Sequence, residues 1–145
     1  MPNSPRAFYQ VLRLHQLVSA CLDESLAPEA LTAAQYTMLS LVRRLGPTTS
    51  AQLARWLQVS AQSAGEMLKN LEARGWVARG ESETNRRIVL LSLTPSGKRV
   101  VQRADQLVTA AEERFFAALS ARERTAFDRT IQRLRQSVEP HDHTA

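Results

Sequence analysis

Apolar residues recur every three or four positions near both ends of the chain, the spacing that places them on one face of an α-helix. The first stretch opens at Ser4-Pro5, which fits an N-cap followed by proline in the first helical turn. The last stretch opens at Thr94-Pro95 and is divided at Ser120, where a capping box starts a further helix. The pattern therefore predicts helices over about residues 4–26 and 95–138.

Three shorter helices are predicted between these ends, each with its own start or stop residues. The first begins at the capping box of Thr32 and stops at Gly46-Pro47, because this pair does not continue a helix. Thr49 opens a second capping box, and Ser60 caps the third helix, which ends where Gly75 follows its last turn. Only a brief connection separates the last two helices, a spacing typical of a helix-turn-helix.

Two short strands are predicted after the helix-turn-helix. Residues 76–79 are a strand candidate, and residues 88–93 are rich in β-branched and aliphatic side chains. The polar loop between them predicts a hairpin whose tip contains Gly80 and Asn85. The expected fold is therefore mainly α with a small β-hairpin wing, and residues 32–93 form the winged-helix lobe.

The length and composition are those of one ordinary domain, residues 1–145, with enough hydrophobic residues (43%) for a core without disulfides. The single cysteine, Cys21, excludes an intrachain disulfide and favours a reducing compartment. The sequence contains neither a membrane-spanning apolar run nor a signal-peptide pattern, so we expect a soluble cytoplasmic protein with no membrane partner. The tail, residues 139–145, is expected to be disordered.

The positive charge of the chain is concentrated in its middle third. Of the formal net charge of +5, residues 49–99 carry +4, whereas residues 1–48 carry +1 and residues 100–145 carry none. A local basic excess attracts polyanions, of which nucleic acid is the usual one. A well-solvated surface of a basic protein is the alternative.

Arg86 and Arg87 lie where the predicted hairpin tip turns into the returning strand. A winged helix places its second helix in a major groove and its hairpin at the adjacent minor groove or backbone. A narrow minor groove concentrates negative potential, which an inserted arginine exploits. The two arginines therefore predict a contact with DNA, the alternative being a solvated hairpin tip.

The helix order and three local motifs resemble the MarR family of winged-helix transcription regulators. The motifs are LARWLQVS, LEARGWVAR and NRR…LSLTPSG, and the resemblance covers nearly the whole chain. It implies a homodimer held by the N- and C-terminal helices and a pseudo-palindromic double-stranded DNA operator, usually bound as a repressor. The family's wing carries an Asp-x-Arg pattern in which the Asp orients the Arg. Here Arg87 matches the Arg, and Asn85 replaces the Asp as the wing-supporting residue.

The helix after Ser60 is the predicted recognition helix. Its expected outward residues are Ala61, Gln62, Ser63, Gly65, Glu66, Lys69 and Asn70. Gln62 is suited to adenine, Ser63 to a base or a phosphate, and Lys69 to a phosphate. The predicted DNA-binding residues are Thr49, Ser50, Ser60, Gln62, Ser63, Lys69, Arg74, Arg86 and Arg87.

Two outward residues of this helix need an explanation. Gly65 lowers helix propensity by roughly 1 kcal/mol relative to alanine, a cost that close approach to DNA or to another helix would justify. Glu66 would repel phosphates unless its carboxylate accepts a hydrogen bond from a cytosine amino group or pairs with a nearby arginine.

Three other residues are candidates for a second function. Members of the family often bind small aromatic or phenolic anions, and His15 and Arg43 are candidate contacts for such an effector. The alternatives are an interface histidine and a favourable charge at a helix C-terminus. Cys21 is a candidate redox switch, as in the peroxide-sensing branch of the family, or a buried structural thiol.

Other function classes find little support in the sequence. We expect no enzyme and no cofactor, because the chain has no glycine-rich phosphate loop, no HExxH and no Cys-x-x-Cys. His141 and His143 in the tail make a poor metal site. A winged-helix protein-interaction module with weak DNA binding remains the alternative function.

Overall fold

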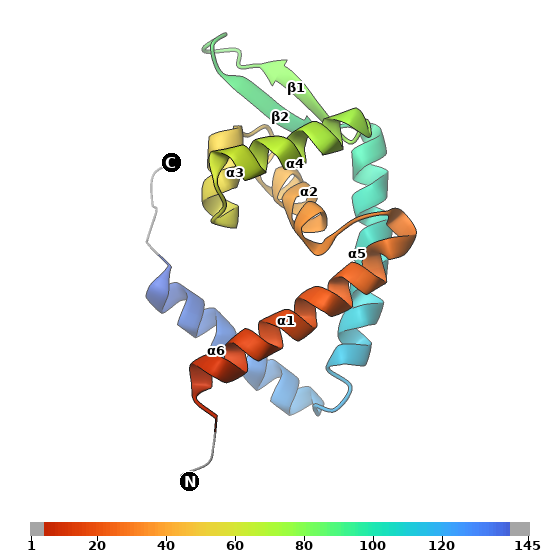
Figure 1. Cartoon of the computed structure of the whole chain (residues 1–145), viewed down its shortest axis with the longest axis vertical. Helices are drawn as coiled ribbons and strands as arrows, with labels where there is room; N and C mark the ends of the chain where they lie inside the picture. The colour runs from red at the N-terminus through yellow and green to blue at the C-terminus, as the bar shows by residue number, and fades with distance from the viewer. Residues whose placement is uncertain (1–4, 140–145) are drawn as a thin grey trace. The chain divides into compact units, whose positions relative to one another are not determined.

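The computed structural model describes residues 5–139, which form helices and one short hairpin (Figure 1). The chain divides into two compact units, Met1–Ala111 and Glu112–Ala145, each described by itself below. The elements, in chain order, are α1 (Ala7–Leu26), the 3₁₀ turn η1 (Ala27–Glu29), α2 (Ala33–Leu45), α3 (Ser50–Leu57), α4 (Ala61–Ala73), β1 (Val77–Glu81), β2 (Val89–Leu93), α5 (Pro95–Phe115) and α6 (Ala121–Val138).

The predicted helix caps are present at most helix starts. Complete capping boxes begin at Thr32, Thr49 and Ser120, and each satisfies backbone N–H groups that have no partner within the helix. The hydroxyl of Ser60 likewise accepts from the backbone N–H of Ser63 at 3.0 Å. Gly75 follows α4 with φ +75°, the left-handed conformation that glycine adopts without steric cost.

The predicted start of the first helix is wrong by about two residues. Helix α1 begins at Ala7, and its N-cap is Arg6, which makes no side-chain capping hydrogen bond. Arg6 has φ −56° and ψ 144°, an extended backbone, so the helix cannot include Pro5. Ser4 lies outside the described residues.

The hairpin pairs β1 with β2 in antiparallel register, from Val77 opposite Leu93 to Glu81 opposite Val89. Gly80 was expected in the tip, but it lies within β1 opposite Leu90. The pairing extends past it because the backbone N–H of Ser82 also donates to the carbonyl of Ile88, at 3.1 Å.

A single residue, Thr48, adds a third strand segment to the hairpin. Its backbone N–H donates to the carbonyl of Leu91 at 3.0 Å, and the N–H of Leu91 donates back at 2.7 Å. Thr48 is 2% exposed, so this bridge ties the turn before α3 to the base of the wing.

The core of the first unit joins the helix-turn-helix to the hairpin and to α5. The predicted inner face of α4 is buried at Ala64, Leu68 and Leu71, and Met67 is half-buried. Fully burying one leucine side chain stabilises the fold by about 1.5–3 kcal/mol. Other core residues are Leu26, Met38, Leu39, Val42, Leu53, Leu91, Val100, Val101 and Ala104.

Two helices keep apolar side chains on the surface. In α1 the predicted apolar face is present, but Phe8 is 86% and Leu12 is 63% exposed. In α6, Leu134 and Val138 are also exposed, although they continue the apolar spacing that begins at Phe127. No helix among residues 5–139 is long and apolar enough to cross a membrane.

Candidate nucleic-acid interface

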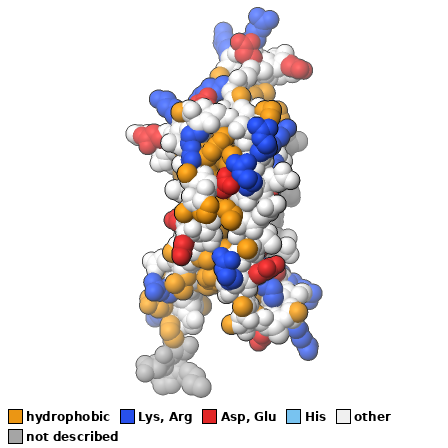
Figure 2. Space-filling view, turned by 90° about the vertical axis from the view of Figure 1, so that its right-hand side faces the viewer, with side chains coloured by type: hydrophobic (Ala, Val, Ile, Leu, Met, Phe, Trp, Pro, Cys, Tyr) orange, Lys and Arg blue, Asp and Glu red, His pale blue; other side chains and the backbone are white. Residues whose placement is uncertain are grey.

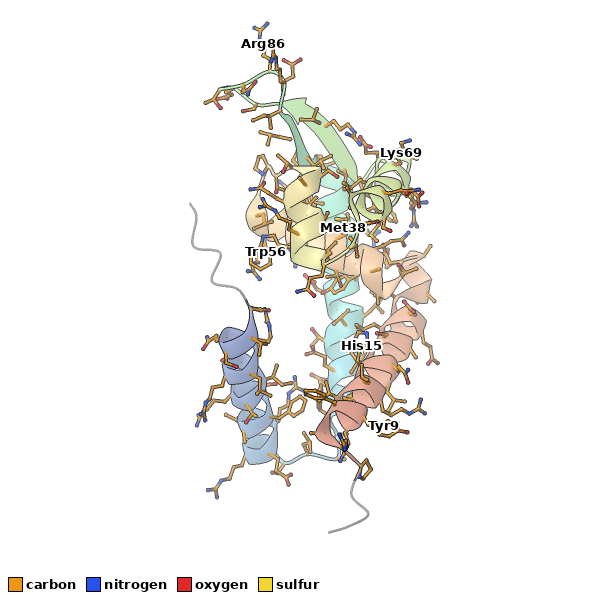
Figure 3. All side chains as sticks on the ribbon, turned by 60° about the vertical axis from the view of Figure 1, so that its left-hand side comes forward. Tyr9, His15, Met38, Trp56, Lys69 and Arg86 are labelled. Atoms are coloured by element: carbon orange, nitrogen blue, oxygen red, sulfur yellow. The ribbon has the colours of Figure 1, made fainter. Side chains whose placement is uncertain are left out.

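The exposed side of α4 presents polar residues opposite its buried face. Gln62, Glu66 and Lys69 recur at helical spacing on the side away from Leu68 and Leu71, and all three are exposed. Figure 3 shows Lys69 projecting outward from this helix. This is the surface that a helix-turn-helix places in a major groove.

Asn70 differs from the other predicted outward residues. Its side-chain oxygen accepts a hydrogen bond from the amide of Gln35, at 3.2 Å, so the residue joins α4 to α2. Gly65 has open space beside it, because an added Cβ would meet no atom within 4 Å. Of the two explanations for this glycine, close packing against another helix is therefore wrong for the described residues.

The predicted contacts at the starts of α3 and α4 are also capping residues. The hydroxyl of Thr49 accepts from the backbone N–H of Gln52 at 3.2 Å, and Ser50 is half-buried beside it. Ser60 and Ser63 share a hydroxyl–hydroxyl hydrogen bond of 3.0 Å in addition to the cap. These hydroxyls cap the helix starts, where the positive end of each helix dipole lies.

The wing tip is ordered by Asn85. Its side-chain oxygen accepts from the backbone N–H of Arg87 at 3.0 Å, and its carbonyl accepts from the N–H of Ile88 at 3.0 Å. This is an Asx-type turn, which needs only a neutral acceptor and therefore tolerates asparagine in place of aspartate. The contact fixes the backbone at Arg87 and leaves its side chain exposed.

Arg86 and Arg87 carry the free positive charge of the tip. Both side chains are exposed, and within residues 5–139 neither forms an ion pair. Figure 3 shows Arg86 at the outer end of the wing, and Figure 2 shows basic and acidic side chains together at that end. The acids there are Glu81 and Glu83.

Arg74 is less available than the sequence suggested. Its guanidinium lies 3.8 Å from the centre of the Trp76 ring, a cation–π contact, and the residue is half-buried. Nearby, Arg79 of β1 forms an ion pair with Glu72 of α4. The guanidinium of Arg74 is therefore held against an aromatic ring, and that of Arg79 is held by an acid.

Of the two candidate effector contacts, Arg43 already has a partner. Arg43 of α2 forms an ion pair of 2.6 Å with Asp105 of α5, which also accepts from the hydroxyl of Tyr36 at 2.7 Å. His15 lies on α1 and is exposed. The Arg43–Asp105 pair could not be predicted from the sequence, because no local pattern links residues so far apart in the chain.

The contribution of Arg43, Asp105 and Tyr36 to folding stability can be tested by changing the pH. Burial alone would raise the pKa of Asp105, but hydrogen bonds from Arg43 and Tyr36 hold that pKa below its usual value. Its stabilisation is therefore present above the unfolded pKa of about 3.9 and is lost as pH falls through the lower folded value. Because both charged groups are partly exposed, we expect Asp105→Asn to cost at most about 1 kcal/mol at pH 7.

The measurement is urea denaturation of wild type and Asp105→Asn at pH 7 and pH 3. The difference in stability between the two proteins should shrink at the lower pH. A stability difference between wild type and Asp105→Asn that is the same at pH 7 and pH 3 would contradict the contribution assigned to Asp105.

The contribution of Tyr36 has the opposite pH dependence, because burial and the hydrogen bond to Asp105 raise its pKa to about 12. Its contribution is present below the unfolded pKa of about 10 and is lost as pH rises through 12.

The described residues include one free thiol and no cluster of potential metal ligands. Cys21 is a half-buried free thiol on α1. No group of three or more histidine, cysteine or acidic side chains gathers in metal-binding geometry within residues 5–139. His141 and His143 lie outside that range.

The chain is similar to known regulators over most of its length. The model of the MarR family matches residues 31–89, from the start of α2 to the wing. A transcriptional repressor of Mycobacterium tuberculosis, Rv2887, is 30% identical over 126 residues, which covers 87% of this chain and 91% of that protein. The multiple antibiotic resistance protein MarR of Escherichia coli is 30% identical over 115 residues, covering 74% and 80%.

A solved structure of a relative includes nucleic acid. The transcriptional repressor CouR, bound to a 23-mer DNA duplex, superposes with a TM-score of 0.83 at 28% identity, covering 89% of this chain and 92% of that one. The helix-turn-helix and the hairpin described above belong to the fold that this chain shares with that relative. The chain therefore belongs to the MarR family of winged-helix transcriptional regulators.

Proposed function

We propose that the protein is a homodimeric repressor that binds a pseudo-palindromic DNA operator. The observation that carries the proposal is the combination, in one compact unit, of an exposed polar face on α4 with wing-tip arginines that form no ion pair within residues 5–139. Gln62 and Ser63 face the bases in this arrangement, Lys69 faces a phosphate, and Arg87 enters the minor groove.

The other predicted DNA contacts position the protein on the DNA backbone. Backbone N–H groups at the starts of α3 and α4, near Thr49, Ser50 and Ser60, meet phosphates. Arg86 and Arg74 add charge at the two edges of the interface. These contacts fix the position of the protein on DNA and are not expected to select the sequence.

Selection from a random duplex library tests this function. A homodimer should enrich an inverted repeat whose half-sites lie about 10 base pairs apart, or a multiple of that spacing. Enrichment of a single half-site would contradict the dimeric arrangement. The absence of any enriched sequence would contradict sequence-specific binding.

The exposed apolar face of α1 supports the dimer. Phe8, Val11 and Leu12 are all more than 60% exposed, a cluster that a soluble protein usually covers with a partner. We expect Leu12→Glu to convert a dimer to a monomer, because it adds a charge to that face without disturbing the core. Gln10→Glu, on a polar exposed position of the same helix, should leave the dimer intact.

Sedimentation velocity of the three proteins at one protomer concentration distinguishes these cases. A wild type that sediments as a monomer, or a Leu12→Glu variant that remains a dimer, would exclude this face as the interface.

An effector is the remaining part of the proposal. We propose that an aromatic or phenolic anion binds the dimer and releases the DNA, with His15 as its contact. Arg43 is the weaker candidate, because Asp105 already neutralises its guanidinium. The effector can shift DNA binding only by its difference in affinity between the two conformations of the dimer.

A further inference from the structure

An acid, Glu66, lies at the centre of the exposed face of α4. Glu66 follows Gln62 by one helical turn and lies on the side of α4 opposite the buried residues Ala64, Leu68 and Leu71. When α4 enters a major groove, this carboxylate faces the base edges. Its negative charge must then find a donor or oppose binding.

No cation of the described chain neutralises Glu66. Among residues 5–139, no lysine, arginine or histidine nitrogen lies within 4.0 Å of its carboxylate. The arginines that flank the C-terminal end of α4 are engaged elsewhere, since Arg79 pairs with Glu72 and Arg74 stacks on Trp76. The sequence left two explanations for an acid at this position. Pairing with a nearby arginine is therefore excluded among the described residues.

Within residues 5–139, the one side-chain hydrogen bond of Glu66 is weak and replaceable. The amide nitrogen of Gln62 donates to the Glu66 carboxylate over 3.4 Å, a long hydrogen bond between two exposed side chains. Exchanging this contact for contacts with base edges costs little. It also frees the Gln62 amide to read a neighbouring base.

Base chemistry then limits what Glu66 can bind. Guanine presents two acceptors in the major groove and thymine presents an acceptor and a methyl group, so a carboxylate is repelled or unsatisfied at both. Adenine places an acceptor, N7, next to its amino group, which suits an amide that donates and accepts. Cytosine presents its N4 amino group alone, which suits a carboxylate.

We propose that Glu66 is a specificity-determining residue that accepts a hydrogen bond from the N4 amino group of one cytosine in each half-site. This inference rests on the proposed function, because it requires α4 to enter the major groove. The open space at Gly65, where an added Cβ would meet no atom within 4 Å, lets the helix approach the base pairs beside Glu66.

The test compares wild type, Glu66→Ala and Glu66→Gln by selection from the same random duplex library. Wild type should enrich cytosine at one position of each half-site, and changing that base should weaken its binding about tenfold, the discrimination expected of one good base contact. Glu66→Ala should lose the preference at that position alone. Glu66→Gln should shift it from cytosine to adenine, because glutamine both donates and accepts.

Lys69→Ala is the matched control, since it removes an exposed charge three residues away on the same helix. It should weaken binding to all duplexes and leave the base preference unchanged. An unchanged cytosine preference in Glu66→Ala, with the wild-type motif otherwise intact, would overturn this inference and leave the proposed function standing. A wild type that enriches no motif would overturn both. Equal thermal melting of the variants establishes that each is folded.

Discussion

Replacing Gly97 with alanine is expected to lower the free energy of unfolding by about 3 kcal/mol, the upper end of the usual cost of overpacking. Gly97 lies in the first turn of α5 and is buried. A Cβ added there would lie 2.1 Å from the carbonyl oxygen of Trp76 and 2.9 Å from its carbonyl carbon. Because both are backbone atoms, no rotamer change relieves the overlap, and the first turn of α5 must move away from the wing.

The surrounding hydrogen bonds make that movement costly. The hydroxyl of Thr94 donates to the carbonyl of Gly75 at 2.6 Å and accepts from the N–H of Gly97 at 3.0 Å. The N–H of Thr94 also donates to the carbonyl of Trp76 at 3.0 Å. One residue therefore joins the end of α4 to the start of α5, and displacing either side breaks several of these bonds.

Urea denaturation at a fixed protomer concentration measures the effect as a lower midpoint with an unchanged slope. Gly65→Ala is the control, because its Cβ would meet no atom within 4 Å and glycine is unfavourable inside a helix. That variant should be more stable than wild type by up to about 1 kcal/mol. A Gly97→Ala protein as stable as wild type would show that the close approach to Trp76 is not maintained in solution.

Replacing Arg87 with alanine is expected to weaken operator binding by at least about 100-fold. A hydrogen bond to a charged group contributes about 1.5–3 kcal/mol, the dimer carries two copies of the wing, and each 1.4 kcal/mol corresponds to about tenfold in affinity. The variant also removes two positive charges from the complex. The slope of log affinity against log salt should therefore become shallower by about 2.

Two further variants locate the effect. Arg133→Ala removes an exposed arginine of α6 and should leave operator affinity within about twofold, since Arg133 is not among the predicted DNA contacts. Asn85→Ala removes the acceptor that fixes the backbone of Arg87, so it should lower affinity less than Arg87→Ala and leave the salt slope near the wild-type value. Fluorescence anisotropy measures all three. Wild-type affinity in Arg87→Ala would exclude the wing from the interface.

Local sequence patterns predicted the parts of the fold that local chemistry determines. The capping boxes at Thr32, Thr49 and Ser120 and the glycine after α4 are confirmed, because a cap is set by residues within one helical turn. The family and the mainly helical fold with its hairpin wing are also confirmed. The residues of the DNA interface stay predictions.

Contacts between distant segments could not be predicted in the same way. Thr48 joins the hairpin through one residue, which leaves no alternating pattern to read. The pair Arg43–Asp105 links two helices through side chains that are each equally plausible on a solvated surface. Gly80 resembles a turn residue in the sequence, but pairing with Leu90 places it inside a strand.

The most direct test of the central claim is fluorescence anisotropy of the purified protein with two duplexes of equal length at two salt concentrations. One duplex carries the DNA upstream of its own gene, and the other is a scrambled version. We expect a preference of about 10³-fold or more for the upstream DNA, with affinity falling steeply as salt rises. No binding to either duplex at low salt would contradict it and would favour a winged helix that binds proteins instead.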